Sequence, residues 1–473
     1  MTDDRDLHQV EKDDVSPLPS SPSSFRAPLG RPAWYGASPT PSFNFLSGSA
    51  PAPNFSAASQ RAPFKSRLID PDREREHLLR CETKLGKQQA RKNLIACLVP
   101  VLVGLVGAAA LIVTGYLGIK KHDYCLVLED NFDGPLDTTI WKHEQETGGF
   151  GNSQFDWTTD SANNSYTKDG MLYIVPTLTA DSIGEAAIMN GYQLNLTTTG
   201  TCTAANTSDP VSCSVASNLT EGIIIPPVQS ARLTTKGTKS IKYGKVEVRA
   251  RMPTGDWLWP AIWMMPRDEV YGPWPKSGEI DIVESKGNLP TKRSQELANV
   301  VSSTLHWGPF SYFDGYRLTH DIDRVYRNFF NQKFYTFGME WDEEGITVWR
   351  EVPSRPFFIS KFKVDRYELG GFPRFSDNGT AIVSPWGGSS NKAAAPFDQD
   401  FYLILNVAAG GTNGYFEDGD ISKPWSNSNN VTKARSDFWA QRNTWLPTWP
   451  SDPSQRGMVV DYVKMWQLGK CTS

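Results

Sequence analysis

Excess charge of one sign and internal repeats are both missing from this chain of 473 residues. Its 48 Lys and Arg residues nearly balance its 52 Asp and Glu residues, which leaves a formal net charge of −4. A chain so close to neutrality lacks the general basic surface that nucleic-acid binding requires, and it gives no indication of a polyanionic partner. The length exceeds that of one typical domain, but no second catalytic module is visible. We therefore expect one functional domain, with part of the extra length outside it.

Long apolar runs are equally scarce, with a single exception at residues 94–119, which contain no charged side chain. As a helix with a rise of about 1.5 Å per residue, this run would extend roughly 39 Å, which exceeds the roughly 30 Å of a hydrocarbon core. Pro100 and several glycines lie within it, but membrane helices tolerate such residues. A signal peptide would have a shorter apolar region close to the first residue, whereas some ninety residues precede this run. The sequence therefore predicts one transmembrane helix over residues 93–119.

Basic residues flank the predicted span unequally. Those that precede it are Arg73, Arg75, Arg80, Lys84, Lys87, Arg91 and Lys92, and those close behind it are Lys120 and Lys121. The positive-inside rule then places residues 1–92 in the cytoplasm and residues 123–473 in the lumen or outside the cell. This is the layout of a single-pass type II protein of the plasma membrane or secretory pathway. Residues 1–65 are rich in Ser, Pro and Ala, and we expect them to be disordered because they cannot bury enough apolar surface.

Glycosylation patterns and cysteines agree with this orientation. The acceptor patterns after the span begin at Asn163, Asn195, Asn206, Asn218, Asn378 and Asn430, whereas the pattern at Asn54 would remain unused in the cytoplasm. Cys125, Cys202, Cys213 and Cys471 also follow the span, and an oxidising compartment permits them to pair in three ways. We favour Cys202 with Cys213, which closes a short loop, and Cys125 with Cys471, because chain termini commonly lie close together. Cys81 and Cys97 are expected to stay reduced or to be acylated.

Short apolar and aromatic runs separated by Gly, Pro, Asn and Asp follow residue 129, and helical periodicity is rare. This pattern predicts an all-β sandwich. The clearest strand candidates are residues 171–176, 231–235, 244–252, 261–265, 279–284, 334–341, 345–350, 401–407 and 458–467. We interpret residues 177–228, a polar stretch, as a loop insertion at the edge of the sandwich. Further insertions are predicted at residues 290–300, 315–332 and 366–396.

Three carboxylates lie within residues 279–284, a strand-like segment. Because side chains of a strand alternate between faces, Glu279 and Asp281 share one face and Glu284 points to the other. A single β-bulge near Ile282 and Val283 would return Glu284 to the first face. Clustered carboxylates raise the pKa of at least one member, and an acid beside a carboxylate suits glycosidic bond cleavage. The alternative is a solvated polar strand face, since short acidic patterns recur by chance.

Flanking segments give the acidic strand a family context. They are residues 243–253 (YGKVEVRARMP), 255–266 (GDWLWPAIWMMP), 305–308 (LHWG), 403–411 (LILNVAAGG) and 458–467 (MVVDYVKMWQ). With the bulged form of the acidic strand, these blocks resemble family-16 glycoside hydrolases, most closely their laminarinase-like branch, over residues 129–467. That branch also includes invertebrate glucan-recognition proteins. The resemblance implies a β-jelly roll with a sugar-binding cleft across its concave sheet.

The resemblance also implies a mechanism, with Glu279 as the nucleophile, Glu284 as the general acid/base, and Asp281 hydrogen-bonded to the nucleophile. It predicts retaining cleavage of internal bonds in β-1,3-glucan or mixed β-glucan. The acceptor in the second step is water or another sugar, so transglycosylation is an alternative. The type II layout is similar to that of fungal proteins that help to assemble cell-wall β-1,6-glucan. A non-catalytic β-glucan receptor is a further alternative, although both glutamates are retained here.

Aromatic faces suit the apolar faces of pyranose rings, so the tryptophans that precede the acids are candidates for sugar binding. Because we expect Pro260 to break the strand register, we assign Trp259, Trp263 and Trp274 to the cleft. For Trp257, Trp425 and Trp445, core packing is an equally good interpretation. His306 matches a family position close to the catalytic acids, where it would tune their protonation or bind sugar. Asn406 and Asn152 match substrate-binding family positions, although the sequence after Asn152 departs from the family pattern.

The resemblance implies no required cofactor. Some family members carry a structural calcium away from the catalytic face, and Glu129 and Asp461 occupy the corresponding positions here. Acids at strand ends are usually just solvated, so this site is a weaker expectation than the catalytic one. The sequence does not predict an oligomeric state.

Overall fold

The computed structural model describes residue 76 and residues 83–117, 122–207, 210–290, 297–376, 379–419 and 422–471. The chain divides into two compact units, Met1–Ala109 and Ala110–Ser473, and the boundary lies within helix α2 (Lys84–Leu117). Residues 1–65, for which we expect disorder, lie outside the described residues.

Helix α2 contains the apolar run. It is 34 residues long, and none of its side chains is buried. Within the described part of the chain, it is the one helix that is long and apolar enough to cross a membrane. It begins nine residues before the predicted span, because the basic segment that ends at Lys92 continues the same helix. The last two residues of that span, 118 and 119, lie outside the described residues.

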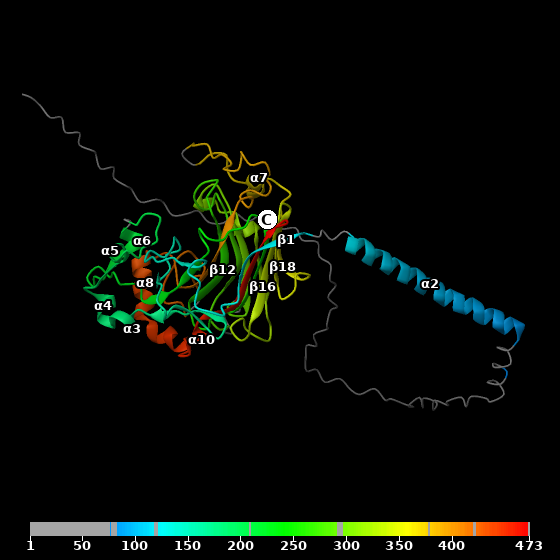
Figure 1. The fold of residues 1–473 in the computed structure, drawn as a ribbon, viewed down its shortest axis with the longest axis horizontal. Coiled ribbons are helices and arrows are strands. Elements are labelled where there is room, and N and C mark those ends of the chain that lie inside the picture. The colour runs from blue at the N-terminus through cyan, green and yellow to red at the C-terminus, as the bar shows by residue number, and fades with distance from the viewer. Residues whose placement is uncertain are drawn as a thin grey trace, which may run out of the picture. The chain divides into compact units, whose positions relative to one another are not determined.

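Two large antiparallel sheets form the body of the second unit (Figure 1). The seven-stranded sheet runs in the order β15 (His320–Arg324), β14 (Val300–His306), β13 (Glu279–Ser285), β12 (Leu258–Pro266), β19 (Phe401–Ala409), β10 (Arg232–Thr234) and β2 (Lys142–His143). The eight-stranded sheet runs in the order β18 (Pro356–Lys361), β17 (Gly345–Arg350), β16 (Tyr335–Asp342), β11 (Gly244–Arg251), β20 (Met458–Leu468), β5 (Met171–Ile174) and β4 (Ser165–Lys168), with β1 (Tyr124–Asp130) paired to β20.

The core lies between these sheets. Alternate side chains of the seven-stranded sheet, such as Ile262, Ile280 and Leu405, pack in the same apolar cluster as Val248 and Phe337 of the eight-stranded sheet. This alternation follows from the pleat, because every second side chain of a strand points to the same face. The expected all-β sandwich is confirmed.

Each predicted strand is present, with ends that shift by up to three residues. One expectation about register was wrong. Pro260 does not interrupt its strand, because β12 begins at Leu258 and Pro260 pairs with Val407 of β19. Trp259 and Trp263 therefore share one face of a continuous strand, whereas Trp257 lies just before the strand with a φ of 68°.

Residues 177–228 are not the polar loop that we predicted. They form a compact subdomain with the small core of Leu194, Leu196 and Ile225. Its elements are β6 (Thr177–Leu178), α3 (Ala180–Ile183), α4 (Glu185–Met189), β7 (Gln193–Asn195), α5 (Leu196–Thr199), α6 (Pro210–Cys213), β8 (Ser214–Ala216) and the first residue of β9 (Val228–Ser230). Strand β9 forms a small sheet with β6 and β3 (Asp156–Thr158).

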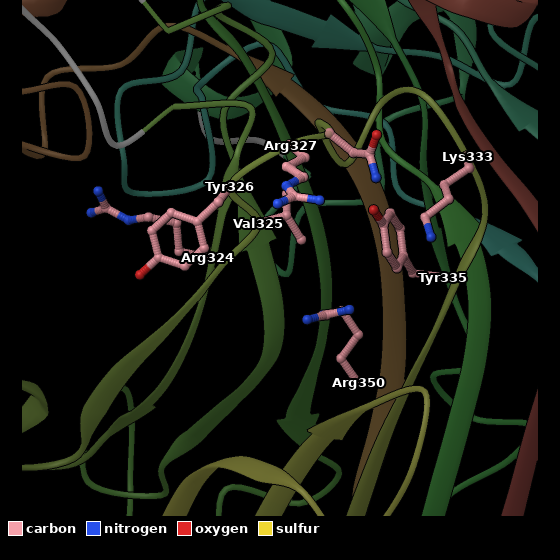
Figure 2. A pocket seen from close by; sticks show the side chains of 8 residues that line it. Arg324, Val325, Tyr326, Arg327, Lys333, Tyr335 and Arg350 are labelled. Carbon is pink, nitrogen blue, oxygen red and sulfur yellow. The ribbon is translucent and has the colours of Figure 1, made fainter. Parts of the chain in front are cut away.

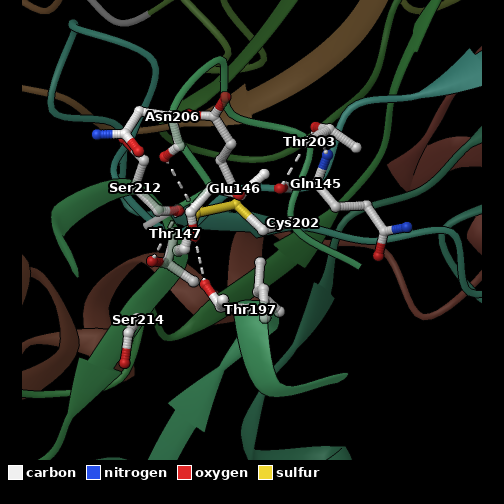
Figure 3. The surroundings of a disulfide bond; sticks show 12 residues. Gln145, Glu146, Thr147, Thr197, Cys202, Thr203, Asn206, Ser212 and Ser214 are labelled. Atoms are coloured by element: carbon white, nitrogen blue, oxygen red, sulfur yellow. Dashed lines mark hydrogen bonds between the residues drawn. A yellow bond between two sulfur atoms is a disulfide. The ribbon is translucent and has the colours of Figure 1, made fainter. Parts of the chain in front are cut away.

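The Cys202–Cys213 disulfide lies inside this subdomain (Figure 3). Hydrogen bonds tie its neighbours to residues 145–147: Thr203 N donates to Gln145 O over 3.1 Å, and Thr147 N donates to Ser212 O over 2.8 Å. The other disulfide joins Cys125 to Cys471, at the open ends of the paired strands β1 and β20. These are the two pairings that we favoured among the three.

The remaining helices are short and lie in loops. They are η1 (Ser311–Phe313), η2 (Tyr316–Leu318), α7 (Arg366–Gly370), α8 (Val431–Ala440), α9 (Arg442–Trp445), η3 (Leu446–Thr448) and α10 (Pro453–Arg456). Strand β15 and helix η2 occupy much of the insertion predicted at residues 315–332, and α7 lies in that predicted at 366–396. Of the insertion predicted at 290–300, residues 291–296 lie outside the described residues.

Replacement of Gly338 by alanine should destabilise the sandwich. Gly338 faces Trp349 across strands β16 and β17, and an added Cβ would lie 2.0 Å from the buried Trp349 ring. Since the ring must move, we expect the free energy of unfolding of the full chain, measured by urea titration, to fall by about 1–3 kcal/mol. The matched control is Gly134→Ala, whose Cβ would meet no atom within 4 Å. Equal stability of the two variants would contradict this account of the packing.

Candidate active site

Strand β13 contains the predicted bulge. Along β14, Asp281 pairs with Thr304 and the next pair is Glu284 with Ser302, so two residues of β13 lie opposite one residue of β14. Along β12, Asp281 pairs with Trp263 and Val283 pairs with Ile262, which makes Ile282 the inserted residue. The insertion changes the phase of the strand. The predicted β-bulge is therefore confirmed, and Glu284 returns to the face that carries Glu279 and Asp281.

Cross-strand pairs extend this acidic face over four strands. Glu284 lies beside Ala261 of β12, Ala261 beside Asn406 of β19, and Asn406 beside Arg232 of β10. The opposite face of the same sheet carries Ile280, Ile282 and other fully buried apolar residues. The acids and their neighbours thus occupy the outer face because the apolar residues between them are buried in the core.

Two tryptophans each hold one glutamate. Trp274 Nε1 donates to Glu279 Oε2 over 2.6 Å, and Trp259 Nε1 donates to Glu284 Oε1 over 2.8 Å. The Trp259 ring stacks on Tyr415, with centroids 4.0 Å apart and an interplanar angle of 7°. Trp274 remains 38% exposed, so part of its ring is available to a ligand. The structure thus brings both of these predicted tryptophans to the acids.

His306 lies between two further acids. Its Nε2 is 3.2 Å from Asp281 Oδ2, and its Nδ1 is 2.5 Å from Asp314 Oδ2. The other oxygen of Asp314 accepts from the backbone N–H groups of Trp307 and Tyr316, which fixes the carboxylate. Asp314 therefore orients the imidazole, and the imidazole faces Asp281.

Burial separates the protonation behaviour of these groups. Burial, more than the neighbouring charges, raises the pKa of Glu284 to about 7. Burial and the charges of Glu279 and Glu284 raise the pKa of Asp281 well above its usual value, and this side chain is only 2% exposed. Burial lowers the pKa of His306, but contacts with Asp281 and Asp314 outweigh it and raise the pKa well above the usual value. Burial and mutual repulsion therefore favour the protonated forms of Glu284 and Asp281.

The third predicted tryptophan, Trp263, pairs with Asp281 across strands β12 and β13. Trp263 Nε1 donates to Asn406 Oδ1 over 2.8 Å, which brings these two predicted sugar-binding residues together. The Arg232 guanidinium lies 4.6 Å from the Trp263 ring centre and 4.0 Å from that of Phe150. Arg232 also forms an ion pair with Glu144.

Asn152 lies in a different environment. Its Oδ1 accepts a hydrogen bond of 3.1 Å from Asn413 Nδ2, and its backbone oxygen accepts from Thr412 N over 3.2 Å. These partners belong to the loop that follows β19, where Ala409 pairs with Leu258. The structure therefore places Asn152 beyond the end of the strand pair that carries Trp259 and Asn406.

The three tryptophans with two open interpretations pack in the core. Trp257, Trp425 and Trp445 are each at most 4% exposed and belong to the main apolar cluster. Trp425 Nε1 donates to Gly411 O, and Trp445 Nε1 donates to Phe438 O. They support the sandwich and its neighbouring helices.

Sequence reasoning missed four residues of the site: Arg232, Lys286, Asp314 and Tyr415. The charges of Glu284 and Asp281 add to burial in raising the pKa of Tyr415 well above its usual value. The Lys286 ammonium lies 5.0 Å from the centre of the Tyr415 ring. Strand parity alone could have identified Arg232, but Asp314 and Tyr415 lie in loops whose positions local patterns do not specify.

Metal ligands were predicted at Glu129 and Asp461. Glu129 Oε1 lies 2.9 Å from Lys464 Nζ, and Asp461 forms an ion pair with Arg249. Each acid already has a cationic partner, which a calcium ion would have to displace, so calcium stays a prediction without structural support. Among the described residues, one group of acids and His has ligand atoms that all lie within 4.8 Å of one another. Its members are Glu279, Asp281 and His306. Within this group His306 contacts Asp281, and Trp274 donates to Glu279, an arrangement that suits proton transfer.

Comparisons with known proteins agree with this geometry. The model of the glycosyl hydrolases family 16 matches residues 179–395. Beta-1,3-glucan-binding protein of Penaeus monodon is 38% identical over 381 residues, which cover 77% of this chain and 98% of that protein. Glucan endo-1,3-beta-glucosidase A1 of Niallia circulans is 29% identical over 298 residues, which cover 60% of this chain but 34% of that protein.

Among solved structures, the catalytic domain of an endo-1,3-beta-glucanase (laminarinase) from Thermotoga petrophila is 23% identical, with a TM-score of 0.45, and the match covers 74% of this chain and 100% of that chain. The Penaeus monodon protein is similar enough, over nearly its whole length, to decide the family. The chain belongs to family 16 of the glycosyl hydrolases.

Proposed function

We propose that the second unit is a retaining glycosidase that cleaves internal bonds of β-1,3-glucan or mixed β-glucan. The observation that carries the proposal is the bulge in β13, which places a buried Glu284 on the same face as Glu279. With a pKa of about 7, Glu284 keeps a substantial protonated fraction at neutral pH. A protonated and an ionised carboxyl group on one face are the minimum that acid-assisted glycosidic cleavage requires.

In the first step, Glu279 attacks the anomeric carbon while Glu284 donates its proton to the departing glycosidic oxygen. The bond from the anomeric carbon to that oxygen breaks, and a bond to Glu279 forms. In the second step, Glu284 takes a proton from water or a sugar hydroxyl, whose oxygen displaces Glu279. Burial and the neighbouring carboxylates raise the pKa of Asp281, which favours the protonated form that a hydrogen bond to the nucleophile requires. Contacts with Asp281 and Asp314 hold His306 beside this pair.

The substrate assignment rests on the aromatic groups and on the relatives. Trp274 and Trp263 offer ring faces or edges beside the acids, and Asn406 offers an amide in the same row. Two of the similar proteins are named for binding beta-1,3-glucan and for endo-1,3-beta-glucosidase activity on glucan, and this supports the same substrate class here. A β-linked glucan with apolar pyranose faces fits such a surface.

Glucan binding without cleavage is the second candidate, because the Penaeus monodon protein is named for binding. Transglycosylation is the third, since it shares the first step with hydrolysis. Product analysis of a defined β-1,3-oligosaccharide by mass spectrometry separates the three. Shorter products indicate hydrolysis, longer products indicate transglycosylation, and an unchanged substrate that still binds indicates a receptor.

We also propose that α2 anchors the chain in a membrane, with the N-terminus in the cytoplasm and the β-sandwich in the lumen or outside the cell. The support is the length and apolar character of α2, together with the basic residues Lys84, Lys87 and Arg91 in its first turns. The resulting anchored enzyme would act on glucan close to the membrane.

Loss of either glutamate should abolish turnover. We expect Glu284→Gln to lower kcat/KM on laminarin by roughly 10²- to 10⁴-fold, because the amide cannot donate the proton, and Glu279→Ala to lower it at least as much. Reducing-end release by the full chain measures both. The control is Glu368→Gln, an exposed position in α7. If both catalytic variants turned over laminarin at the unchanged rate, our roles for these residues would be wrong.

The pH–rate profile should report Glu284. Because the first step needs its proton, we expect kcat/KM to fall as the pH rises through about 7. Trp259→Phe replaces the indole with a smaller aromatic ring that can still stack on Tyr415, but it removes the N–H that favours the carboxylate, so the alkaline limb should move to higher pH. Trp445→Phe, away from the acids, is the control. An alkaline limb that stays in place, or moves down, would contradict the assignment of Glu284 as the acid.

Translation of the full chain with microsomes tests the membrane topology. We expect glycans on exposed acceptors such as Asn163, Asn206 and Asn430, because the luminal side is accessible to the transferase. Glycosidase treatment should shift the mobility of the product, and added protease should leave the β-sandwich intact until detergent opens the vesicles. Asn54 should carry no glycan. Digestion of the β-sandwich in sealed vesicles would rule out this orientation.

A further inference from the structure

A pocket at the edge of the sandwich collects positive charge. Its volume is about 390 Å³, and its lining comprises Arg324, Val325, Tyr326, Arg327, Asn328, Lys333, Tyr335 and Arg350. In Figure 2, Arg327, Lys333, Tyr335 and Arg350 surround one space, while Arg324 and Tyr326 project to its other side. Small-ligand sites commonly have volumes of about 300–1,000 Å³. This pocket is large enough for one charged group and part of the molecule that carries it.

Among the described residues, the lining contains four cationic side chains and no carboxylate. Asp323 lies outside it and forms an ion pair of 2.5 Å with Arg350, and the charge of Glu351 acts on Tyr335. Within the part of the chain that the structure describes, Arg327 and Lys333 form no ion pair, so these two side chains supply the positive excess. The chain as a whole carries a net charge of −4, so the positive charge at this pocket results from a local cluster of cations.

Three separate segments supply the cations. Arg324 ends strand β15 of the seven-stranded sheet, Arg327 and Lys333 lie in the following loop, and Arg350 ends strand β17 of the other sheet. The Tyr335 ring is buried between Lys333, 4.7 Å from its centre, and Arg350, 5.4 Å from its centre. Burial raises the pKa of Tyr335, so its hydroxyl remains a hydrogen-bond donor. Donors thus converge from several directions, which suits an anion with several acceptor oxygens.

We propose that this pocket binds a tetrahedral oxyanion, the phosphate or sulfate group of a ligand. Arginine forks match the oxygens of such groups, and a lysine adds a compact charge. The site is separate from the acids of β13. In the sheet order, β15 is two strands from β13, and Arg324 pairs with Val300, two residues beyond the Ser302 that pairs with Glu284. The pocket therefore lies at the edge of the same sheet whose face carries the proposed active site.

Calorimetric titration of the full chain in a non-ionic detergent with sodium phosphate and sodium sulfate tests the proposal, with sodium chloride at equal ionic strength as the reference. We expect saturable binding of both oxyanions, and binding at least about tenfold weaker in Arg327→Gln/Lys333→Gln, because charge-assisted hydrogen bonds are lost. The matched control is Arg355→Gln/Lys363→Gln, two exposed cations outside the lining. The charge-preserving variant Arg327→Lys/Lys333→Arg should retain most of the affinity.

Dextran sulfate and uncharged dextran then distinguish the two sources of the anion. Tighter binding of dextran sulfate than of free sulfate, lost in the same double variant, shows that the pocket takes an ester carried on a polysaccharide. Binding of the free anions alone shows a site for the inorganic ion. Absence of saturable binding, or equal weakening in both glutamine variants, would overturn the proposal. All variants lie outside the acid face, so a loss of anion binding can be distinguished from a loss of laminarin cleavage.

Discussion

The pleat of a β-strand and the need to bury its apolar side chains together constrain the site. In β13, Ile280, Ile282 and Val283 are all fully buried, so the strand can present three acids on one face only if it contains an extra residue. Without the bulge, Glu284 would point into the apolar core, where a charge without a partner costs several kcal/mol. With it, the same residue faces Ala261 and receives the N–H of Trp259. Every chemical property that we assign to Glu284 depends on this change of phase.

The acids also depend on what surrounds them, because carboxylates this close cannot all be ionised. Asp281 is almost fully covered, with His306 against one oxygen, and Tyr415 and Trp259 close the space near Glu284. Low exposure strengthens both the repulsion among the acids and the attraction to His306. The protons that remain bound at neutral pH are thus a consequence of packing. They are also what a mechanism that transfers protons in both directions requires.

Local patterns in the sequence were sufficient for the strands and for the acid cluster. Alternating residues identified β11, β13, β16 and β20, and one misplaced acid was enough to predict the bulge, since both features depend on neighbours along the chain. Pro260 was misjudged because its missing N–H is tolerated at this position of β12, which only the pairing with β19 reveals. Asp314 and Tyr415 reach the acids through loops whose course depends on tertiary contacts. The subdomain within residues 177–228 looked like a polar loop because its buried core consists of only three apolar residues beside one disulfide, too few to form a periodic apolar pattern.

Net charge was equally uninformative, because this chain separates its charges in space. The outer face of the seven-stranded sheet carries Glu279, Asp281 and Glu284, while cations gather at the edge beyond β15. Salt screens exposed charges beyond about 8 Å at physiological ionic strength, and each strand adds about 4.8 Å, so two strands are enough to make the two regions electrostatically distinct. An anionic group would be repelled from the acids and held by Arg327, Lys333 and Arg350, whereas a neutral glucose unit meets no such penalty at the acids.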